Sequence, residues 1–142
     1  VLAGDIPAQL IAAAHAAGRR VVVDLRASDF ARYAGADVII PHRTDLNPGE
    51  DPPEGDDAIA AAAEALRQAH GFGAVFVKRG DEGMTLVDAT GPTHFRLDPA
   101  LLIDLSGAGD AAVATLAACL AASIKLPTAA LLANAAAGSV GA

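Results

Sequence analysis

The residues with the clearest chemical potential lie in one short stretch, "DLSGAGDAAVA", residues 104–114. Gly107, Ala108 and Gly109 precede an alanine-rich segment typical of a helix, so consecutive backbone N–H groups would face outward at its start. These amides and the helix dipole favour an anion, yet the next residue is Asp110, itself an anion. The two features agree if the amides stabilise a phosphoryl group during transfer while Asp110 accepts the proton of an attacking hydroxyl. The helix start would keep that carboxylate ionised.

Two other interpretations use the same residues. Asp110 could simply cap its helix, because a negative side chain is favoured at a helix start, but this leaves both glycines and Asp104 unexplained. The spacing of the glycines and Ala112 also fits the G-x-G-x-x-G/A pattern of dinucleotide-binding folds. That fold needs an acidic residue about 20 positions further on, and residues 111–142 contain no Asp or Glu. We therefore reject dinucleotide binding and leave the capping interpretation open.

The elements that would position this stretch alternate between strands and helices. Short, continuously apolar runs predict strands buried on both faces of a parallel sheet, and alanine-rich runs with polar or proline starts and glycine stops predict helices. The expected strands are 20–24, 36–41, 73–78 and 101–104, with a hairpin of 84–88 and 93–97. The expected helices are 7–17, 56–70, 109–122 and 127–138, with one helical turn in 28–35 and a long loop over 42–57. This alternation indicates an α/β layered sheet.

The composition restricts the class of protein. The chain has 142 residues, 53% of them hydrophobic, and a net charge of −7, which suits one domain with its own core and argues against nucleic acid as a partner. No apolar stretch is long enough to span a bilayer. Cys119 is the only cysteine and fits a small core residue in a reducing cytosol. The acidic run 49–57 is interpreted as a solvated loop, with Asp56 and Asp57 capping the helix that follows.

The stretch "DLSGAGD" resembles the D-T-x-G-A-G-D signature of the ribokinase-like (PfkB) carbohydrate kinases. "VKRGDEGMTLVD", residues 77–88, is similar to the family's strand–turn–strand element with K/T-x-G-x-x-G, and residues 130–142 are similar to its last helix. Within the family, residues 21–41 most resemble the heptose-7-phosphate kinase domain of bifunctional ADP-heptose synthases. The resemblance covers nearly the whole chain.

This resemblance implies a ribokinase-like three-layer α/β/α sandwich with a mainly parallel sheet, of which residues 1–142 form the C-terminal, nucleotide-binding portion, truncated at both ends. It makes Asp110 the catalytic base and the amides of residues 107–109 the anion hole. Asp104 would position the phosphates or their cation. The implied cofactors are ATP and Mg²⁺.

The resemblance also assigns the nucleotide pocket. Lys78, Gly80 and Gly83 would line it, the two glycines through backbone shape, and Asn134 would lie near the adenine. Local alternatives stay open: residues 79–83 could be a plain hairpin turn, and Asn134 could be a solvated residue on an alanine helix.

One element departs from the family pattern. The family's Asn-x-x-Glu, which organises Mg²⁺-bound phosphate after a strand that ends in Pro, is replaced here by His42 and Asp45. Asp45 can still bind Mg²⁺, often through water, although its side chain is shorter than that of Glu. His42 cannot supply an amide oxygen, and a proline-rich loop follows where the family has a helix.

We therefore predict ATP-dependent phosphoryl transfer to a hydroxyl of a sugar or sugar phosphate, with a phosphorylated heptose or related sugar as the acceptor. The changes at His42 and Asp45 leave a non-catalytic nucleotide- or sugar-phosphate-binding relative as the alternative, and a purely structural α/β subunit as a third. The chain begins with Val1 and its only methionine is Met84, so we expect a piece of a longer protein, inactive alone, whose N-terminal half holds the sugar-binding segment. The resemblance allows a homodimer of that longer protein, and no membrane partner is expected.

Overall fold

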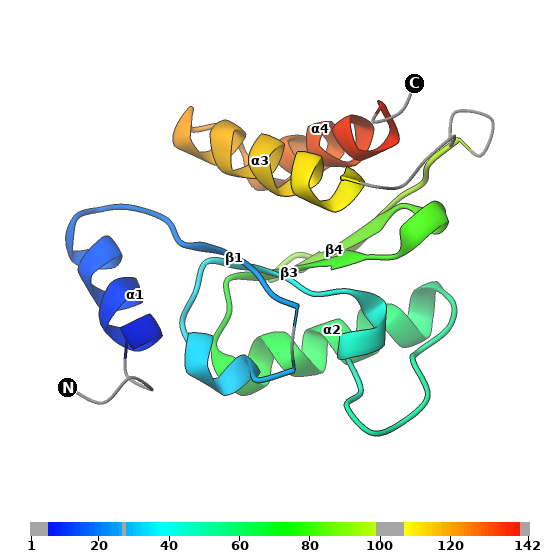
Figure 1. Ribbon diagram of the computed structural model, residues 1–142, viewed down its shortest axis with the longest axis horizontal. Coiled ribbons are helices and arrows are strands. Elements are labelled where there is room, and N and C mark those ends of the chain that lie inside the picture. Colours follow the sequence, from blue (N-terminus) through cyan, green and yellow to red (C-terminus); the bar gives the residue numbers. More distant parts are fainter. Residues whose placement is uncertain (1–5, 27, 99–106, 140–142) are drawn as a thin grey trace.

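The computed structural model describes residues 6–26, 28–98 and 107–139, which form one five-stranded sheet with helices on both faces (Figure 1). The strands are β1 (Val22–Asp24), β2 (Val38–Ile40), β3 (Ala74–Lys78), β4 (Met84–Asp88) and β5 (Gly91–Phe95). The helices are α1 (Ile6–Ala16), α2 (Asp56–His70), α3 (Ala108–Ala121) and α4 (Leu126–Ser139). Short 3₁₀ turns lie at η2 (Phe30–Tyr33), η3 (Arg43–Asp45) and η4 (Gly80–Glu82).

The sheet combines two kinds of strand pairing in the order β1-β2-β3-β4-β5. β1, β2 and β3 run parallel, whereas β4 pairs antiparallel with β3, and β5 pairs antiparallel with β4. Helices α3 and α4 cover one face and α2 covers the other (Figure 1). The expected ribokinase-like α/β/α architecture is confirmed. The expected strand 101–104 lies outside the described residues.

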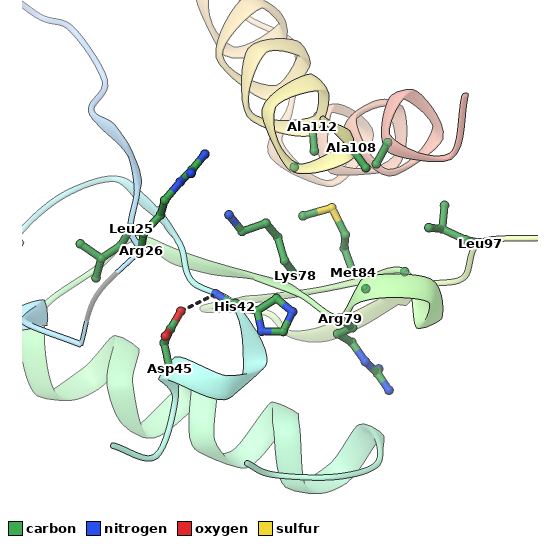
Figure 2. A pocket seen from close by; sticks show the side chains of 14 residues that line it. Leu25, Arg26, His42, Asp45, Lys78, Arg79, Met84, Leu97, Ala108 and Ala112 are labelled. Carbon is green, nitrogen blue, oxygen red and sulfur yellow. Dashed lines mark hydrogen bonds between the residues drawn. The ribbon is translucent and has the colours of Figure 1, made fainter. Parts of the chain in front are cut away.

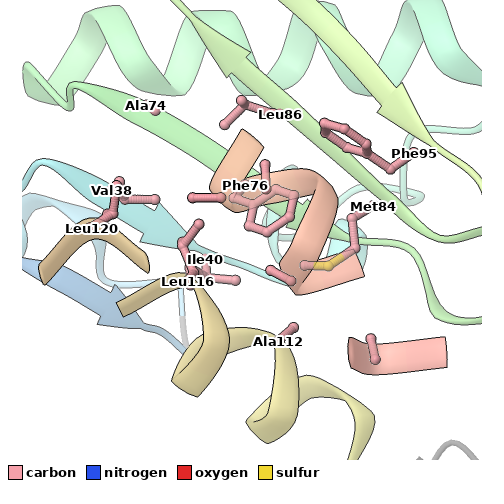
Figure 3. Packing of buried hydrophobic residues seen from close by; sticks show 14 of the residues in the cluster. Val38, Ile40, Ala74, Phe76, Met84, Leu86, Phe95, Ala112, Leu116 and Leu120 are labelled. Atoms are coloured by element: carbon pink, nitrogen blue, oxygen red, sulfur yellow. The ribbon is translucent and has the colours of Figure 1, made fainter. Parts of the chain in front are cut away.

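Alternate residues of the central strands supply two hydrophobic cores, because successive side chains of a strand point to opposite faces. The core beneath α3 and α4 includes Val38, Ile40, Phe76, Leu116 and Leu120 (Figure 3). The core beneath α2 includes Ile39, Val75, Val77, Ile59 and Leu66. Cys119 is half-buried against the first core, as its apolar surroundings predict. Helices on both faces therefore fix the plane of the sheet and the edge where its parallel strands end.

The edge strand β1 differs from expectation. We predicted that it is buried on both faces, but its three residues are each only half-buried. In the described sheet β1 pairs with β2 alone, so one side of it has no neighbouring strand. The hairpin also differs slightly, because β5 begins at Gly91 and ends at Phe95, earlier than the predicted 93–97. In the described ranges no helix has the length and apolar character needed to cross a membrane.

The acidic run before α2 is more than the solvated loop we predicted. The cap of α2 is Gly55 and makes no side-chain cap bond, so Asp56 and Asp57 lie inside the first turn. The carboxylate of Asp56 accepts hydrogen bonds from Arg79 at 2.7 Å and Arg96 at 2.5 Å. The start of α2 is thus tied to the strand–turn–strand segment that follows β3.

Candidate functional site

A pocket of about 480 Å³ opens at the edge of the sheet where the parallel strands end, against the first turns of α3 (Figure 2). The carboxyl ends of parallel strands are where open α/β sheets bind ligands. Sequence reasoning singled out these lining residues: His42, Asp45, Lys78, Gly80, Gly83, Ala108 and Gly109. The other lining residues were not predicted for the site: Leu25, Arg26, Arg79, Met84, Leu97, Ala112 and Ala137. Residues from segments far apart in the sequence therefore meet in one place.

The start of α3 forms one wall of the pocket. Gly107 has φ 79° and ψ −5°, a left-handed conformation that suits glycine, and it is the cap of the helix. Asp110 is consequently inside the first turn and is not the capping residue. Its carboxylate accepts a hydrogen bond from Arg26, a pocket-lining residue, at 3.3 Å, and both side chains are largely exposed. Asp110 thus bonds a side chain that lines the pocket but is not itself among the lining residues. It is not the N-cap, although the first turn of a helix still favours its negative charge.

Lys78 extends from the end of β3 toward the first turns of α3 (Figure 2). Its ammonium donates a hydrogen bond to Asp24 Oδ1 at 2.7 Å, and both side chains are about four-fifths buried, at 19% and 22% exposure. A Cβ at position 109 would lie 3.5 Å from Lys78 Cδ and 3.8 Å from its Nζ. These are ordinary contact distances, so the start of α3 lies beside the lysine, and both line the same pocket.

The His42–Asp45 turn has a structural function of its own. Asp45 Oδ2 accepts a hydrogen bond from the His42 backbone N–H at 3.1 Å, and His42 Nδ1 accepts one from the Thr44 N–H at 3.3 Å, which makes a reciprocal cap of η3. Burial lowers the pKa of His42 below 6.5, and the charges of Lys78 and Arg43 add to this effect against the opposite influence of Asp45. The imidazole at the pocket is therefore neutral at pH 7.

The turn between β3 and β4 is held by a buried arginine. Arg79, with a side chain only 2% exposed, donates to Asp56 at 2.7 Å, to Glu82 at 2.8 Å and to Thr85 at 3.1 Å. Hydrogen bonds from Arg79, followed by those from Arg96, lower the pKa of Asp56. The turn is a hairpin connection, as the local alternative held, and it also lines the pocket through Gly80 and Gly83.

Three described residues that were predicted for the site are not among those lining the pocket: Gly107, Asp110 and Asn134. Asn134 lies on α4 at 4% exposure, so the interpretation of a solvated residue is wrong. Its Nδ2 donates to the Arg96 carbonyl at 3.0 Å, and its buried Oδ1 has no hydrogen-bond partner among the described residues. Asp104 lies outside the described residues.

The predicted Mg²⁺ would have to take its protein ligands from the side chains of the pocket. Among residues 6–26, 28–98 and 107–139, no three His, Cys, Asp or Glu side chains are grouped so that they could hold a metal ion. Mg²⁺ at kinase sites takes one or two carboxylates and completes its shell with phosphates and water. Asp45 is a carboxylate that lines the pocket. The described residues thus fit Mg²⁺ that arrives with a nucleotide, and not a metal held by protein alone.

Sequence reasoning missed Asp24, which bonds Lys78, and Arg26, which bonds Asp110 in the first turn of α3. A signal was present, since both follow the apolar run of β1 and polar residues at such strand ends face the ligand side of the sheet. The apolar wall formed by Met84, Leu97 and Ala137 had no such signal, because apolar residues on these elements are equally typical of a core.

The fold and the pocket define an α/β/α domain of the ribokinase-like class, with its site at the carboxyl ends of the parallel strands. The structure of Arabidopsis thaliana ribokinase complexed with ribose and ATP is similar with a TM-score of 0.80 and 25% identity, covering 95% of this chain and 45% of that one. Phosphofructokinase-2 from Escherichia coli in complex with fructose-6-phosphate gives a TM-score of 0.81 at 22% identity, over 97% of this chain and 46% of that one. The second likeness shows the fold alone.

The profile of the pfkB family carbohydrate kinases matches residues 1–140, and the chain therefore belongs to this family. It is 46% identical over 142 residues to the bifunctional protein HldE of Paramagnetospirillum magneticum and 44% identical to that of Acidiphilium cryptum. Each match covers 99% of this chain and 29% of the relative. The chain thus spans less than a third of the length of these curated relatives.

Proposed function

We propose that this chain forms the nucleotide-binding portion of an ATP-dependent kinase domain, with a hydroxyl of a sugar or sugar phosphate as the acceptor. The observation that carries the proposal is the position of Asp110. Its carboxylate accepts a hydrogen bond from Arg26, which lines the pocket, and Ala108 and Gly109 in the same turn of α3 line the pocket as well. A base and a set of outward-facing amides can therefore act on two neighbouring atoms of one substrate complex.

The reaction follows from these roles. The acceptor oxygen forms a bond to the γ-phosphorus of ATP, the bond from that phosphorus to the β,γ-bridging oxygen breaks, and ADP leaves. The hydroxyl proton goes to the Asp110 carboxylate. The amides of 107–109 and the Lys78 ammonium stabilise the negative charge on the transferred group. Mg²⁺, held by the phosphates and Asp45, would neutralise further charge on the nucleotide.

The acceptor is proposed from similarity. Residues 21–41 resemble heptose-7-phosphate kinases, and the identity of 46% to a bifunctional protein HldE supports a phosphorylated heptose. The relatives' greater length and the 45% coverage of ribokinase support the proposal that further chain supplies the sugar-binding segment. Activity is therefore to be measured on the intact gene product.

The test is Asp110→Asn in the intact protein. We expect kcat to fall by about 10³-fold or more, because the proton acceptor is lost, while the Kd for Mg·ATP stays within about threefold. Asp57→Asn is the matched control, since Asp57 is also an exposed carboxylate in the first turn of a helix, but its helix, α2, covers the opposite face of the sheet from α3 (Figure 1). Wild-type turnover in Asp110→Asn would refute the assignment of the base.

A non-catalytic nucleotide-binding protein is the second candidate. The observation that favours it is the His42–Asp45 turn, where both side chains already accept hydrogen bonds from the turn's own backbone. Calorimetry and a phosphoryl-transfer assay on the intact protein separate the two candidates. Heat from Mg·ATP binding without ADP formation in the presence of sugar phosphates would support the second candidate and contradict the first.

A further inference from the structure

The ion pair between Asp24 and Lys78 joins two strands that are not neighbours. Asp24 is the last residue of β1 and Lys78 the last of β3, with β2 between them, and the carboxylate and ammonium are 2.7 Å apart. Sequence reasoning placed Lys78 in the pocket but gave Asp24 no role. An ion pair about four-fifths removed from solvent contributes little net stability, because the desolvation of both charges offsets their attraction. Folding alone therefore does not explain why this pair is present.

The electrostatic surroundings of Lys78 indicate what the pair does. The ammonium lies next to the start of α3, near position 109, where the helix dipole is positive. Arg26 and Arg79 line the same pocket, but each is paired with carboxylates of its own, Arg26 with Asp110 and Arg79 with Asp56 and Glu82. Without a carboxylate close by, the positive end of α3 would repel the ammonium, and the flexible four-carbon side chain of Lys78 would be free to move away from it. Asp24 holds the ammonium in place.

We propose that Asp24 is a positioning residue that fixes the Lys78 ammonium beside the amides of α3, at the place where the γ-phosphoryl group of ATP is transferred. This inference rests on the proposed kinase function and deepens it. Asp24 acts only through Lys78, since its hydrogen bond leads to that ammonium and it is not among the residues that line the pocket. Besides Lys78 and Arg79, the charged or titratable side chains that line the pocket are Arg26, His42 and Asp45, on the segments after β1 and β2.

A double-mutant cycle in the intact protein tests this dependence. Lys78→Met should lower kcat by about 10²-fold or more, as expected for the loss of one donor to a developing anion. Asp24→Asn should lower kcat by about 10- to 100-fold, because the ammonium is present but displaced. In the Lys78→Met background, Asp24→Asn should change kcat by less than about twofold. Asp24→Glu, which keeps the carboxylate, should recover part of the activity.

The control is Asp37→Asn. Asp37 also bonds a basic side chain, His15 at 2.8 Å, but it precedes β2 and so lies near the opposite end of that strand. Its removal should leave kcat within about twofold, even if it lowers the melting temperature as much as Asp24→Asn does. Equal loss of kcat in the two variants would mean that Asp24 is merely structural and would overturn the inference.

An equilibrium readout separates this inference from the proposed function. The ratio of ATP to ADP affinity reports contact with the γ-phosphoryl group, and Asp24→Asn should lower this ratio about tenfold in the wild-type background and not in Lys78→Met. If the intact protein binds ATP without turnover, the kinase function fails, and the affinity ratio still decides the role of Asp24. If Asp110→Asn abolishes turnover but the effects of Asp24→Asn and Lys78→Met multiply independently, the inference fails alone.

Discussion

The turn between β3 and β4 contains a glycine that the structure requires on steric grounds. Gly83 has φ 100°, and a Cβ added there would lie 1.9 Å from the carbonyl oxygen of Phe95. Gly80, in the same turn, also has a positive φ of 63°, but its Cβ would meet nothing within 4 Å. Alanine substitutions at these two positions therefore share the backbone strain and differ in the clash, which makes Gly80→Ala the matched control for Gly83→Ala.

The two costs follow from this geometry. A non-glycine residue at positive φ costs roughly 1 kcal/mol at Gly80 and up to about 3 kcal/mol in a region as unfavourable as that of Gly83. At Gly83 the Phe95 carbonyl must also retreat by about 1 Å or more to reach ordinary contact. Phe95 pairs with Met84 at one end of the β4–β5 ladder, so this movement breaks backbone hydrogen bonds worth about 1 kcal/mol each. We expect a total loss of about 3–5 kcal/mol for Gly83→Ala.

Thermal unfolding followed by circular dichroism measures both variants. For a domain of this size 1 kcal/mol corresponds to roughly 2–4 °C, so Gly83→Ala should lower Tm by about 10 °C or more, and Gly80→Ala by about 3 °C. Urea midpoints give an independent value for the same difference. Equal Tm values for the two variants would show that β5 moves aside without cost, and the steric reasoning would then be wrong.

Two further predictions concern the other groups around the pocket. Arg79→Met should lower the free energy of unfolding by about 3 kcal/mol in a urea titration, because it leaves Asp56 and Glu82 without their buried partner. Arg96→Met is the control: the Arg96 side chain is 57% exposed, so its loss should cost less than about 1 kcal/mol in the same titration. The pKa of His42 is below 6.5 in the folded state, so as the pH falls the unfolded state binds the proton first. When the pH is lowered from about 8 to about 5, the free energy of unfolding should therefore fall more for the wild type than for His42→Gln. Equal falls would contradict the lowered pKa.

The sequence predicted the elements best where local signals were complete. Helix α2 was predicted with the bounds that the structure gives, because the run from Asp56 to His70 is followed by Gly71, which adopts the left-handed cap that glycine favours. The strand β1 was placed correctly but its burial was not, since burial depends on which strands lie beside it. Strand order is a property of tertiary structure and has no local signal in a single sequence.

The residues of the candidate site were likewise predictable only where their signal in the sequence is local. Gly80, Gly83, Gly109 and Lys78, which line the pocket, could be singled out because their motifs are local, with spacing that the turn and the helix start demand. Asp24 and Arg79 were missed as partners because each acts across a distance in sequence, Asp24 with a residue two strands away and Arg79 with the start of α2. A charged residue next to an apolar run looks the same in the sequence whether its partner is solvent or another strand.

Strand β3 lies between two turns that line the pocket, the His42–Asp45 turn after β2 and the glycine turn before β4. On one side it runs parallel to β2, and the Lys78 backbone N–H donates to the Pro41 carbonyl at 2.8 Å just before His42. On the other side it turns back into β4 through the glycine turn. Because Lys78 is its last residue, any shift of β3 along its axis would move the ammonium and the glycine turn together relative to α3. The pairing of β3 with β2 and its pairing with β4 must therefore both keep β3 at the same position along its axis. A clash at Gly83 disturbs this position, and loss of the Asp24 carboxylate disturbs the Lys78 ammonium at the end of the same strand.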